Sequence, residues 1–221
     1  MFEKHAYCLK NRYKPCPPQR KHARSCKMFC ITWSREQIFL NKTLNYNSRG
    51  EPAVITEQDA VKNAVKTAAE LMVASAKTAP KARGVDNIVT LVLDSKEELE
   101  KLASKMEELA PEHGDFFRRD AQNVRNSLAV ILIGCSISSL QLSKPSKWIL
   151  DPDIVNSLVN LGIAIGSAVK TASLLNIDNR VMFTIGVAAQ ELGLLKADII
   201  YGIPLSVTGK NIFFDRRWPP K

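Results

Sequence analysis

The segment TEQDAVKNAVKTAAELMVASAKTAPKARGVDNIVTLVL (56–93) contains the change of pattern that decides the fold. Thr56 followed by Asp59 has the spacing of a helix N-cap with an acidic third residue, and apolar residues then recur at helical spacing. Pro80 ends that helix, and after a polar loop the run IVTLVL (88–93) has the composition of a strand buried on both faces. A helix followed by such a strand favours a layered α/β domain.

The same alternation continues towards the C-terminus. Ser95 and Glu98 have the spacing of a capping box, and the helix that they begin is expected to end before Pro111. LAVILI (128–133) predicts a second buried strand, followed by a Ser-rich loop over 135–148. The remaining predicted elements are a helix over 153–175, a strand over 181–185, a helix over 187–195 and a strand over 199–203.

These elements predict a fold of the α/β (α+β) class: a single three-layer domain over residues 45–221, with a mixed sheet flanked by helices. The most hydrophobic segment, 154–175, includes two amides and an ammonium, those of Asn156, Asn160 and Lys170. Because amides and an ammonium are costly inside a bilayer, the segment predicts a buried helix of a soluble protein and no membrane partner. Gly162 and Gly166 permit close approach of a second helix, either within the fold or at a dimer interface.

The positive charge of the chain is concentrated at its N-terminus. The 221 residues have a formal net charge of +9, but residues 1–44 hold ten Lys and Arg against two Glu, whereas 45–221 hold 21 basic and 20 acidic residues. We expect 1–44 to be a disordered basic extension outside the domain. Its charge suffices for weak, salt-sensitive contact with nucleic acid but not for specific binding.

Cysteine is distributed in the same way. The extension contains Cys8, Cys16, Cys26 and Cys30, and the rest of the chain has only Cys135. One cysteine cannot build a disulfide scaffold, so the sequence favours a reducing compartment, the cytoplasm. The extension's cysteines, with His5 and His22, could supply zinc ligands, but their gaps lack the paired two-residue knuckle of recognisable zinc motifs, and no metal site is predicted.

The domain lacks the motifs of several enzyme classes. There is no GxSxG, GxxxxGK[ST], GxGxxG or HExxH, and its one histidine, His113, lies in a polar loop, so no catalytic side chain is predicted. If the protein is an enzyme, a cofactor supplies the difficult chemistry. The most informative segment is 76–87, where three cations and an Asp–Asn pair surround Gly84, a residue that lets backbone approach a ligand.

A helix, an Ala-Pro loop, a hydrophobic strand and a capped helix in this order resemble the opening of FMN-dependent nitroreductase-like flavoproteins. Four separated segments resemble more closely a prokaryotic family of uncharacterised ferredoxin-domain-containing proteins: AKTAPKARGVDNI (76–88), NLGIAIGSAVKTA (160–172), IDNRVMFTIGVAA (177–189) and GIPLSVTGKNIFFDR (202–216). The family name implies a cysteine-rich segment between the second strand and the main helix. Residues 136–152 contain no cysteine, so no iron–sulfur cluster is predicted in the domain.

The resemblance implies an FMN-binding oxidoreductase that works as a homodimer and transfers hydride from a nicotinamide donor to an unidentified acceptor. It places Pro80 against the flavin ring, with Lys81 and Arg83 favouring the reduced, anionic flavin and Asn87 binding the ring edge. The remaining candidates are for the phosphate: Ser48, Arg49, Lys210 and Arg216. Arg49 and Arg216 are equally consistent with surface cations, whereas 178–180 are better explained as a turn with a structural ion pair than as ligand residues. The alternative function is a non-catalytic structural or binding protein that kept the fold but lost its redox centre.

Overall fold

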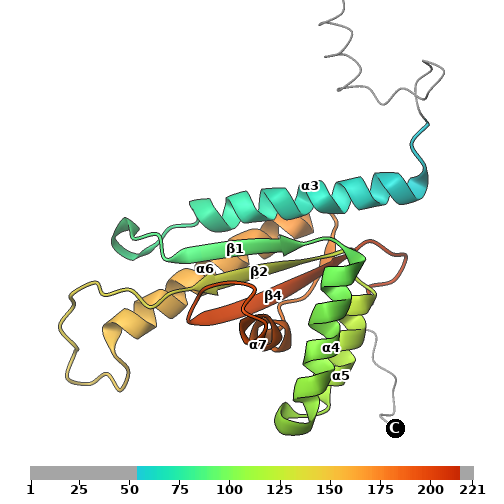
Figure 1. Ribbon diagram of the computed structural model, residues 1–221. Helices are drawn as coiled ribbons and strands as arrows, with labels where there is room; N and C mark the ends of the chain where they lie inside the picture. The colour runs from blue at the N-terminus through green and yellow to red at the C-terminus, as the bar shows by residue number, and fades with distance from the viewer. Residues whose placement is uncertain (1–53, 215–221) are drawn as a thin grey trace, which may run out of the picture. The chain divides into compact units, whose positions relative to one another are not determined.

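A computed structural model describes residues 54–214 (Figure 1). Ser48, Arg49, Arg216 and the cysteines of the basic extension lie outside the described residues. The described helices are α3 (Glu57–Thr78), α4 (Lys96–His113), α5 (Phe116–Arg125), α6 (Pro152–Leu174) and α7 (Phe183–Glu191), with a 3-10 turn η1 (Ala82–Gly84). The described strands are β1 (Ile88–Leu93), β2 (Ala129–Cys135), β3 (Asp178–Asn179) and β4 (Ile199–Ser206).

The strands form one sheet in the order β1-β2-β4-β3, and each described pairing is antiparallel. The predicted mixture of parallel and antiparallel pairs is therefore wrong for this part of the chain. The reason is α5, a helix for which the sequence predicted no element. Because α4 runs away from β1 and α5 returns, the chain enters β2 from the end at which β1 finished, which makes the two strands antiparallel (Figure 1).

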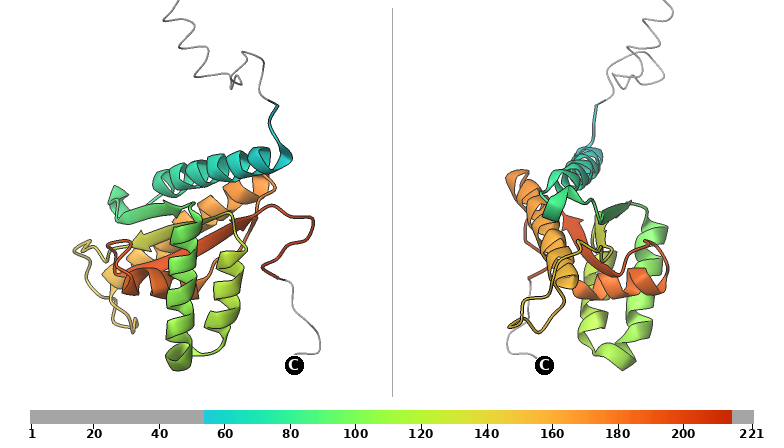
Figure 2. Two further views of the ribbon diagram at one scale, coloured as in Figure 1. Left: turned by 45° about the vertical axis from the view of Figure 1, so that its right-hand side comes forward. Right: turned by 90° about the vertical axis from the view of Figure 1, so that its left-hand side faces the viewer.

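Three layers are present, as predicted. Helices α3 and α6 cover one face of the sheet, and α4, α5 and α7 cover the other (Figure 2). Strand β2 is fully buried and divides its side chains between the two cores: Ile131 and Ile133 face α3 and α6, whereas Val130 and Leu132 face the opposite layer. This alternation is the period-two geometry of a strand covered on both faces.

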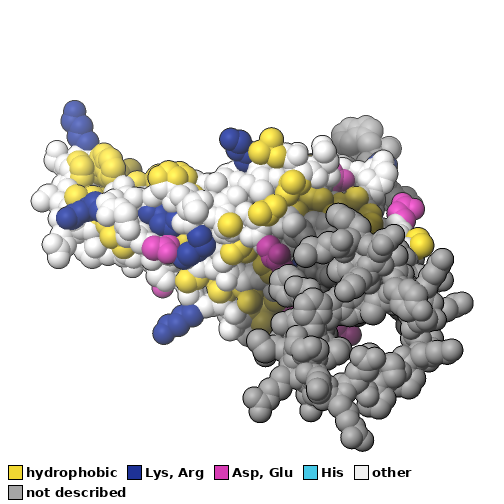
Figure 3. All heavy atoms as spheres, turned by 90° about the horizontal axis from the view of Figure 1, so that it is seen from above, with side chains coloured by type: hydrophobic (Ala, Val, Ile, Leu, Met, Phe, Trp, Pro, Cys, Tyr) yellow, Lys and Arg dark blue, Asp and Glu magenta, His cyan; other side chains and the backbone are white. Residues whose placement is uncertain are grey.

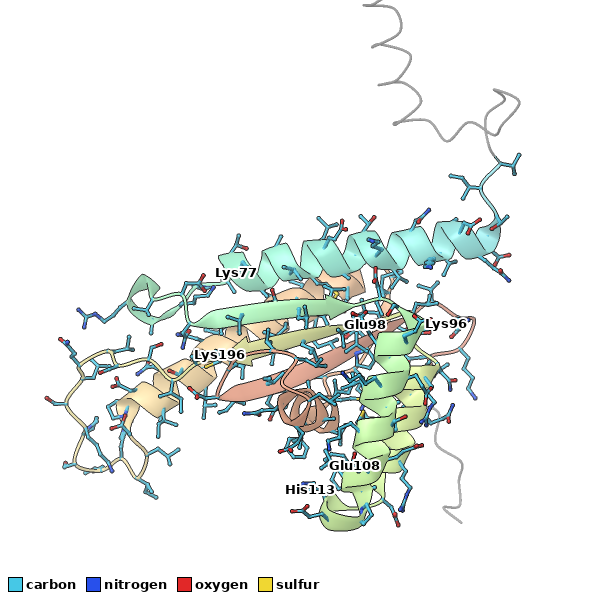
Figure 4. All side chains as sticks on the ribbon, in the orientation of Figure 1. Lys77, Lys96, Glu98, Glu108, His113 and Lys196 are labelled. Atoms are coloured by element: carbon cyan, nitrogen blue, oxygen red, sulfur yellow. The ribbon has the colours of Figure 1, made fainter. Side chains whose placement is uncertain are left out.

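The two ends of the sheet differ in what surrounds them. At one end, here called the η1 end, β1 and β4 begin and β2 finishes, since Ile88 pairs with Cys135 and Cys135 pairs with Ile199. At the other, the β3 end, β4 finishes and pairs with β3. Figure 4 labels Lys77 and Lys196 at the η1 end and Lys96 and Glu98 at the opposite end.

Local signals explain where the helices begin. The Thr56 hydroxyl accepts a hydrogen bond from the Asp59 backbone N–H, and Ser95 and Glu98 form the predicted capping box. Helix α4 does not end before Pro111 but continues to His113, because a proline in the last turn removes only one backbone bond; Gly114, at φ 115°, then ends the helix. The side of the domain that includes α3 exposes charges of both signs among hydrophobic groups (Figure 3).

The predicted strand over 181–185 is wrong. Only Met182 makes a bridge, to Gly202, and the helix α7 has already begun at Phe183. The third strand is instead Asp178–Asn179, in place of the turn expected over 178–180. A β-branched and aromatic run favours a strand locally, but in the folded chain its last residue, Ile185, is buried together with Ala188 and Ala189 on one face of a helix.

Helix α6 is less buried than its hydrophobicity predicted. Only 28% of its most apolar part is buried, because one side packs on α3 and the sheet while the other side is open. Within residues 54–214 it is the one helix long and apolar enough to cross a bilayer, a test that core helices of water-soluble proteins also pass. No heavy atom lies within 4 Å of a Cβ built on Gly162 or Gly166, so no other helix of the described chain packs against these glycines.

Arg125 joins α5 to α4, and the stability that it contributes is expected to depend on pH. Its guanidinium donates to Glu100 (3.0 Å) and Glu107 (2.9 Å), and these bonds hold the pKa of both carboxyls below the ordinary value of 4.5. A lowered folded pKa stabilises the protein above 4.5, and that contribution disappears as the pH falls through the folded values. We therefore expect Arg125→Met to lower the Tm at neutral pH, with a difference that narrows below pH 4.5 in thermal melts followed by circular dichroism.

Arg118→Met is the matched control, because Arg118 pairs with Asp115 on the same turn and acts on Glu107 of α4 only through its charge, as the last of the causes that lower the pKa of that carboxyl. Its Tm should stay near the parent value at every pH, as expected for an exposed local ion pair. A Tm difference for Arg125→Met that is constant from neutral pH to below 4.5 would contradict the role assigned to the carboxylates.

Candidate functional site

Four of the predicted cofactor residues lie on one loop at the η1 end of the sheet. The segment from Pro80 to Asn87 joins α3 to β1 and contains η1. Arg83 and Gly84 both have left-handed backbone conformations, with φ 55° and 70°. Such a conformation is uncommon for arginine and directs the chain sharply away from α3 and back towards β1. The structure therefore brings Pro80, Lys81, Arg83 and Asn87 together.

Lys81 holds the end of α3 rather than extending into solvent. Its Nζ donates to the carbonyls of Ala76 (3.3 Å), Lys77 (2.7 Å) and Ala79 (2.7 Å), and its side chain is only 5% exposed. A cation at the C-terminal end of a helix satisfies carbonyls that have no partner within the helix. The Lys81 ammonium is therefore buried beneath the loop, and it is not exposed on the surface that a ligand would contact.

Asn87 is buried in a small polar network. Its Nδ2 donates to the Ser136 carbonyl (2.9 Å) and contacts the Cys135 sulfur (3.7 Å), and its Oδ1 accepts from Asn160 Nδ2 (3.2 Å). Asn160 in turn accepts the Ala82 backbone N–H at 2.9 Å. The network ties η1, the start of β1, the end of β2 and α6 into one rigid corner.

Asn160 was not among the predicted site residues. It lies on α6, 78 residues from Ala82, and in the sequence it appeared as one amide within a hydrophobic helix. That amide is the only available sequence signal: a buried polar side chain in a core helix requires a partner. The pattern does not say which partner it takes.

Cys135 is buried beside this network. Burial, with a further contribution from the negative charge of Asp198, raises the pKa of its thiol. Its Sγ donates to the Ser157 carbonyl at 3.3 Å. A neutral, buried thiol is a poor nucleophile, so Cys135 is a structural residue of the corner. Among residues 54–214, no group of three His, Cys, Asp or Glu side chains is placed to hold a metal.

Arg83 is the predicted cation that faces outward. Its Nη1 donates to the Leu140 carbonyl (2.7 Å), and Asp153 Oδ1 accepts the Leu140 backbone N–H (2.8 Å), so η1 is joined to the segment that follows β2. A guanidinium has five N–H donors, and one described bond leaves most of them for a ligand. Pro80 and Val85 are exposed on the same loop and offer an apolar surface beside this charge.

Lys210 lies at the other end of the sheet. It follows β4 beyond the β3 end, where the Thr208 hydroxyl donates to its carbonyl and the neighbouring Asn211 donates to Asp178 (3.0 Å). A polar pocket of about 440 Å³ lies at this end, lined by Ser173, Asn176, Ile177, Asp178, Asn179 and Asn211. Within one chain, therefore, Lys210 does not converge with the η1 loop.

Comparison with known proteins gives a family and a similar fold. A family model described as "Uncharacterized protein containing a ferredoxin domain (DUF2148)" matches residues 151–216. An "Uncharacterized protein" from Archaeoglobus fulgidus is 40% identical over 180 residues, which cover 74% of this chain and 97% of that protein. The match to the A. fulgidus protein thus extends well beyond the segment that the family model covers.

Solved structures of low identity share part of the arrangement. A nitroreductase family protein from Clostridium novyi is 14% identical, with a TM-score of 0.49 over 64% of this chain and 73% of that one. A hypothetical oxidoreductase from Bacillus subtilis is 13% identical, with a TM-score of 0.47; the match covers 66% of this chain and 59% of that one. Values this low carry no information on what this chain binds.

Proposed function

The chain belongs to the family of uncharacterised proteins containing a ferredoxin domain, and within that family we propose that it is an FMN-binding oxidoreductase that takes hydride from a nicotinamide donor. The η1 corner carries the proposal: a rigid loop in a left-handed turn presents an arginine beside exposed apolar side chains. Bound FMN supplies the hydride chemistry, and the protein supplies binding, orientation and charge. The electron acceptor stays unassigned.

The donor set of the loop fits the ring of a flavin better than its phosphate. Arg83 offers free N–H donors and a positive charge that stabilises an anionic, reduced ring, and Pro80 and Val85 offer apolar contact. Lys81 and Asn87 would support the site without contacting the flavin, since their polar atoms bind backbone carbonyls beside the loop. The phosphate would then be bound by residues outside the loop, among them Ser48, Arg49, Lys210 and Arg216.

Two copies of the chain would bring these residues together. Lys210 and the η1 loop lie at opposite ends of the sheet, and α6 runs between those ends with an open apolar side. If the α6 helices of two copies pack antiparallel, the β3 end of each copy meets the η1 end of the other. We therefore propose a homodimer in which Lys210 of the second copy completes the site, in a cytoplasmic, reducing environment.

The test is the visible absorption spectrum of the purified full chain, with the released chromophore compared with FMN. We expect a two-banded yellow spectrum and release of FMN, or uptake of added FMN followed by fluorescence quenching. A broad brown absorbance would instead indicate an iron–sulfur cluster. A colourless protein that takes up no FMN when about 100 μM is added would contradict the proposal, because its Kd for FMN would then be too high for a resident cofactor.

Arg83→Gln is expected to weaken FMN binding about tenfold, because a charge-assisted hydrogen bond to an anionic ligand contributes on the order of 1.5 kcal/mol. Fluorescence titration of FMN measures the change. Arg119→Gln is the control, since Arg119 is a half-exposed arginine on α5 that pairs with Asp120 in the opposite layer. Equal weakening in both variants would indicate a general effect of net charge and not a contact at η1.

A second candidate is a non-catalytic protein that kept the fold of the family. One observation favours it: the segment between β2 and α6 contains no cysteine after Cys135. A colourless, stable protein in the spectrum above would support this reading.

A further inference from the structure

The segment between β2 and α6 is divided into an anchored part and an exposed part. Residues 136–140 are held by the domain: Ile137 N–H donates to Asp198 (2.7 Å), Ser138 N–H donates to Ser157 (3.2 Å), and the Leu140 side chain is buried. Residues 141–150 are all exposed. We call this ten-residue segment the lobe; it projects beyond the η1 end, next to the start of α6 (Figure 1).

The lobe is closed by its own hydrogen bonds. Trp148 N–H donates to the Pro145 carbonyl (3.0 Å), and Lys144 Nζ donates to the Ile149 carbonyl (2.8 Å). A short loop that closes on itself in this way presents its side chains on a defined surface. The side chains that it presents are unusually apolar for a solvent-facing loop: Leu142, Trp148, Leu150 and Ile149, the last of them 92% exposed.

A second apolar surface lies along the same helix. The open side of α6 exposes Leu158, Val159 and Ile163, and its C-terminal end exposes Leu174 (72%) and Leu175. The only charged residue from 154 to 175 is Lys170. Monomeric proteins rarely leave large apolar surfaces uncovered. The lobe projects from the domain, whereas the second surface lies along α6. Each could therefore be buried by the other surface of a second copy.

We propose that the lobe of each copy docks on the C-terminal end of α6 of the second copy, in a reciprocal exchange of arms that rests on the homodimer proposed above. Helix α6 has 23 residues, and at 1.5 Å per residue it is about 35 Å long. The open glycines, Gly162 and Gly166, lie near its centre. When two such helices cross there antiparallel, each N-terminal end, with its lobe, lies beside the partner helix's C-terminal end.

The surface that the lobe meets is chemically suited to it. Leu174 and Leu175 offer apolar contact for Ile149 and Leu150. Beside them, the polar pocket at the end of α6 contains the carboxylate of Asp178 and amide oxygens, which are acceptors for the Trp148 indole N–H and the Lys147 ammonium. A parallel crossing would place the two lobes, each with two lysines and no acid, against one another.

The area available is large enough for a stable dimer. If the exposed apolar side chains of α6 and the lobe were all covered, they would remove on the order of 900 Å² per copy from water, against about 800 Å² per partner in a typical stable interface. Without the lobe the open side of α6 supplies about half of that area. The lobe is thus what brings the interface to the size of a stable one.

The experiment is photo-crosslinking with p-benzoylphenylalanine introduced at Trp148 of the full chain, in a mixture of isotopically light and heavy copies. We expect crosslinks that join a light to a heavy chain, with the acceptor peptide within residues 170–179. Crosslinks to the second copy's own lobe, to any segment of the same chain, or to no protein would overturn the arm exchange. Sedimentation velocity on the same sample reports independently whether a dimer is present.

The triple variant Trp148→Ser, Ile149→Ser, Leu150→Ser gives a second measurement. It should weaken the dimer at least tenfold, whereas Phe116→Ser, at an exposed apolar residue of α5 in the opposite layer, should leave the dimer unchanged. A parent chain that is monomeric contradicts both the homodimer and the lobe contact. A dimer that the triple variant does not weaken contradicts the lobe contact alone. A monomer that binds vesicles through the lobe assigns the apolar tip to lipid and overturns the proposal.

Discussion

Gly186→Ala is expected to destabilise the protein by about 3 kcal/mol or more, the upper range for overpacking a core. Gly186 lies in α7, and a Cβ built there would stand 1.7 Å from the Ile200 carbonyl oxygen and 3.0 Å from the Tyr201 Cα. These are backbone atoms of β4 at the point where it pairs with Gly134 and Ile133 of the fully buried strand β2, so they cannot move away. Urea unfolding followed by far-ultraviolet circular dichroism measures the loss.

Gly193→Ala is the matched control, because it makes the same chemical change two residues beyond the end of the same helix. Gly193 has φ 63°, and nothing lies within 4 Å of its added Cβ. The substitution therefore adds left-handed backbone strain without a clash, a cost of about 1 kcal/mol. If the two variants lost equal stability, close packing of α7 on β4 would not be the reason for a glycine at 186.

The close packing of α7 on β4 also explains why the strand predicted over 181–185 is instead the start of a helix. The run Val181 to Ile185 has the residue types of a strand, and no residue within it indicates a helix. The decisive residues are Gly186 and Gly202: a Cβ on Gly202 would lie 1.9 Å from Ile185 Cγ2. A pair of glycines 16 residues apart allows the helix to lie directly on the strand, and their pairing is a tertiary fact that a local pattern does not contain.

Helix α5 is a different case, since its signal was present in the sequence. Phe117, Ala121 and Val124 are buried, with the spacing of one helix face. The segment FFRRDAQNVR is otherwise polar, and it follows a proline and a glycine, which suggest a loop. The spacing of these three apolar residues, given more weight than the polar composition, predicts a helix here. A second helix between β1 and β2 then predicts that the two strands are antiparallel.

The sequence placed several candidate residues on one loop but did not determine their contacts, and their role in binding a cofactor stays a prediction. The sequence grouped Lys81, Arg83 and Asn87 on one loop, and the structure brings them together. The pattern could not show that Lys81 turns back to the carbonyls of α3 or that Asn87 is buried, because both depend on where the loop folds. The same holds for Asn160, whose partners come from two other elements.

Asn160→Leu is expected to be the most damaging change at the η1 corner. It leaves the Ala82 N–H without its acceptor and Asn87 Oδ1 without its donor, and each orphaned group costs about 1–3 kcal/mol. We expect a loss of about 3 kcal/mol in urea unfolding, faster hydrogen exchange at the Ala82 amide and, if FMN binds at η1, an affinity at least about tenfold lower.

Asn156→Leu separates this role from a general need for amides on α6. Asn156 lies one turn earlier, and its side chain donates only to the Pro152 carbonyl of its own helix (2.7 Å). Its replacement removes one local bond and should cost below about 1 kcal/mol, with exchange at Ala82 unchanged. Because exchange at a single amide reports the loop and not the whole fold, a slow Ala82 amide in Asn160→Leu would show that η1 is held by other contacts. In that case the left-handed turn at Arg83, rather than the buried amide pair, would position the proposed flavin site.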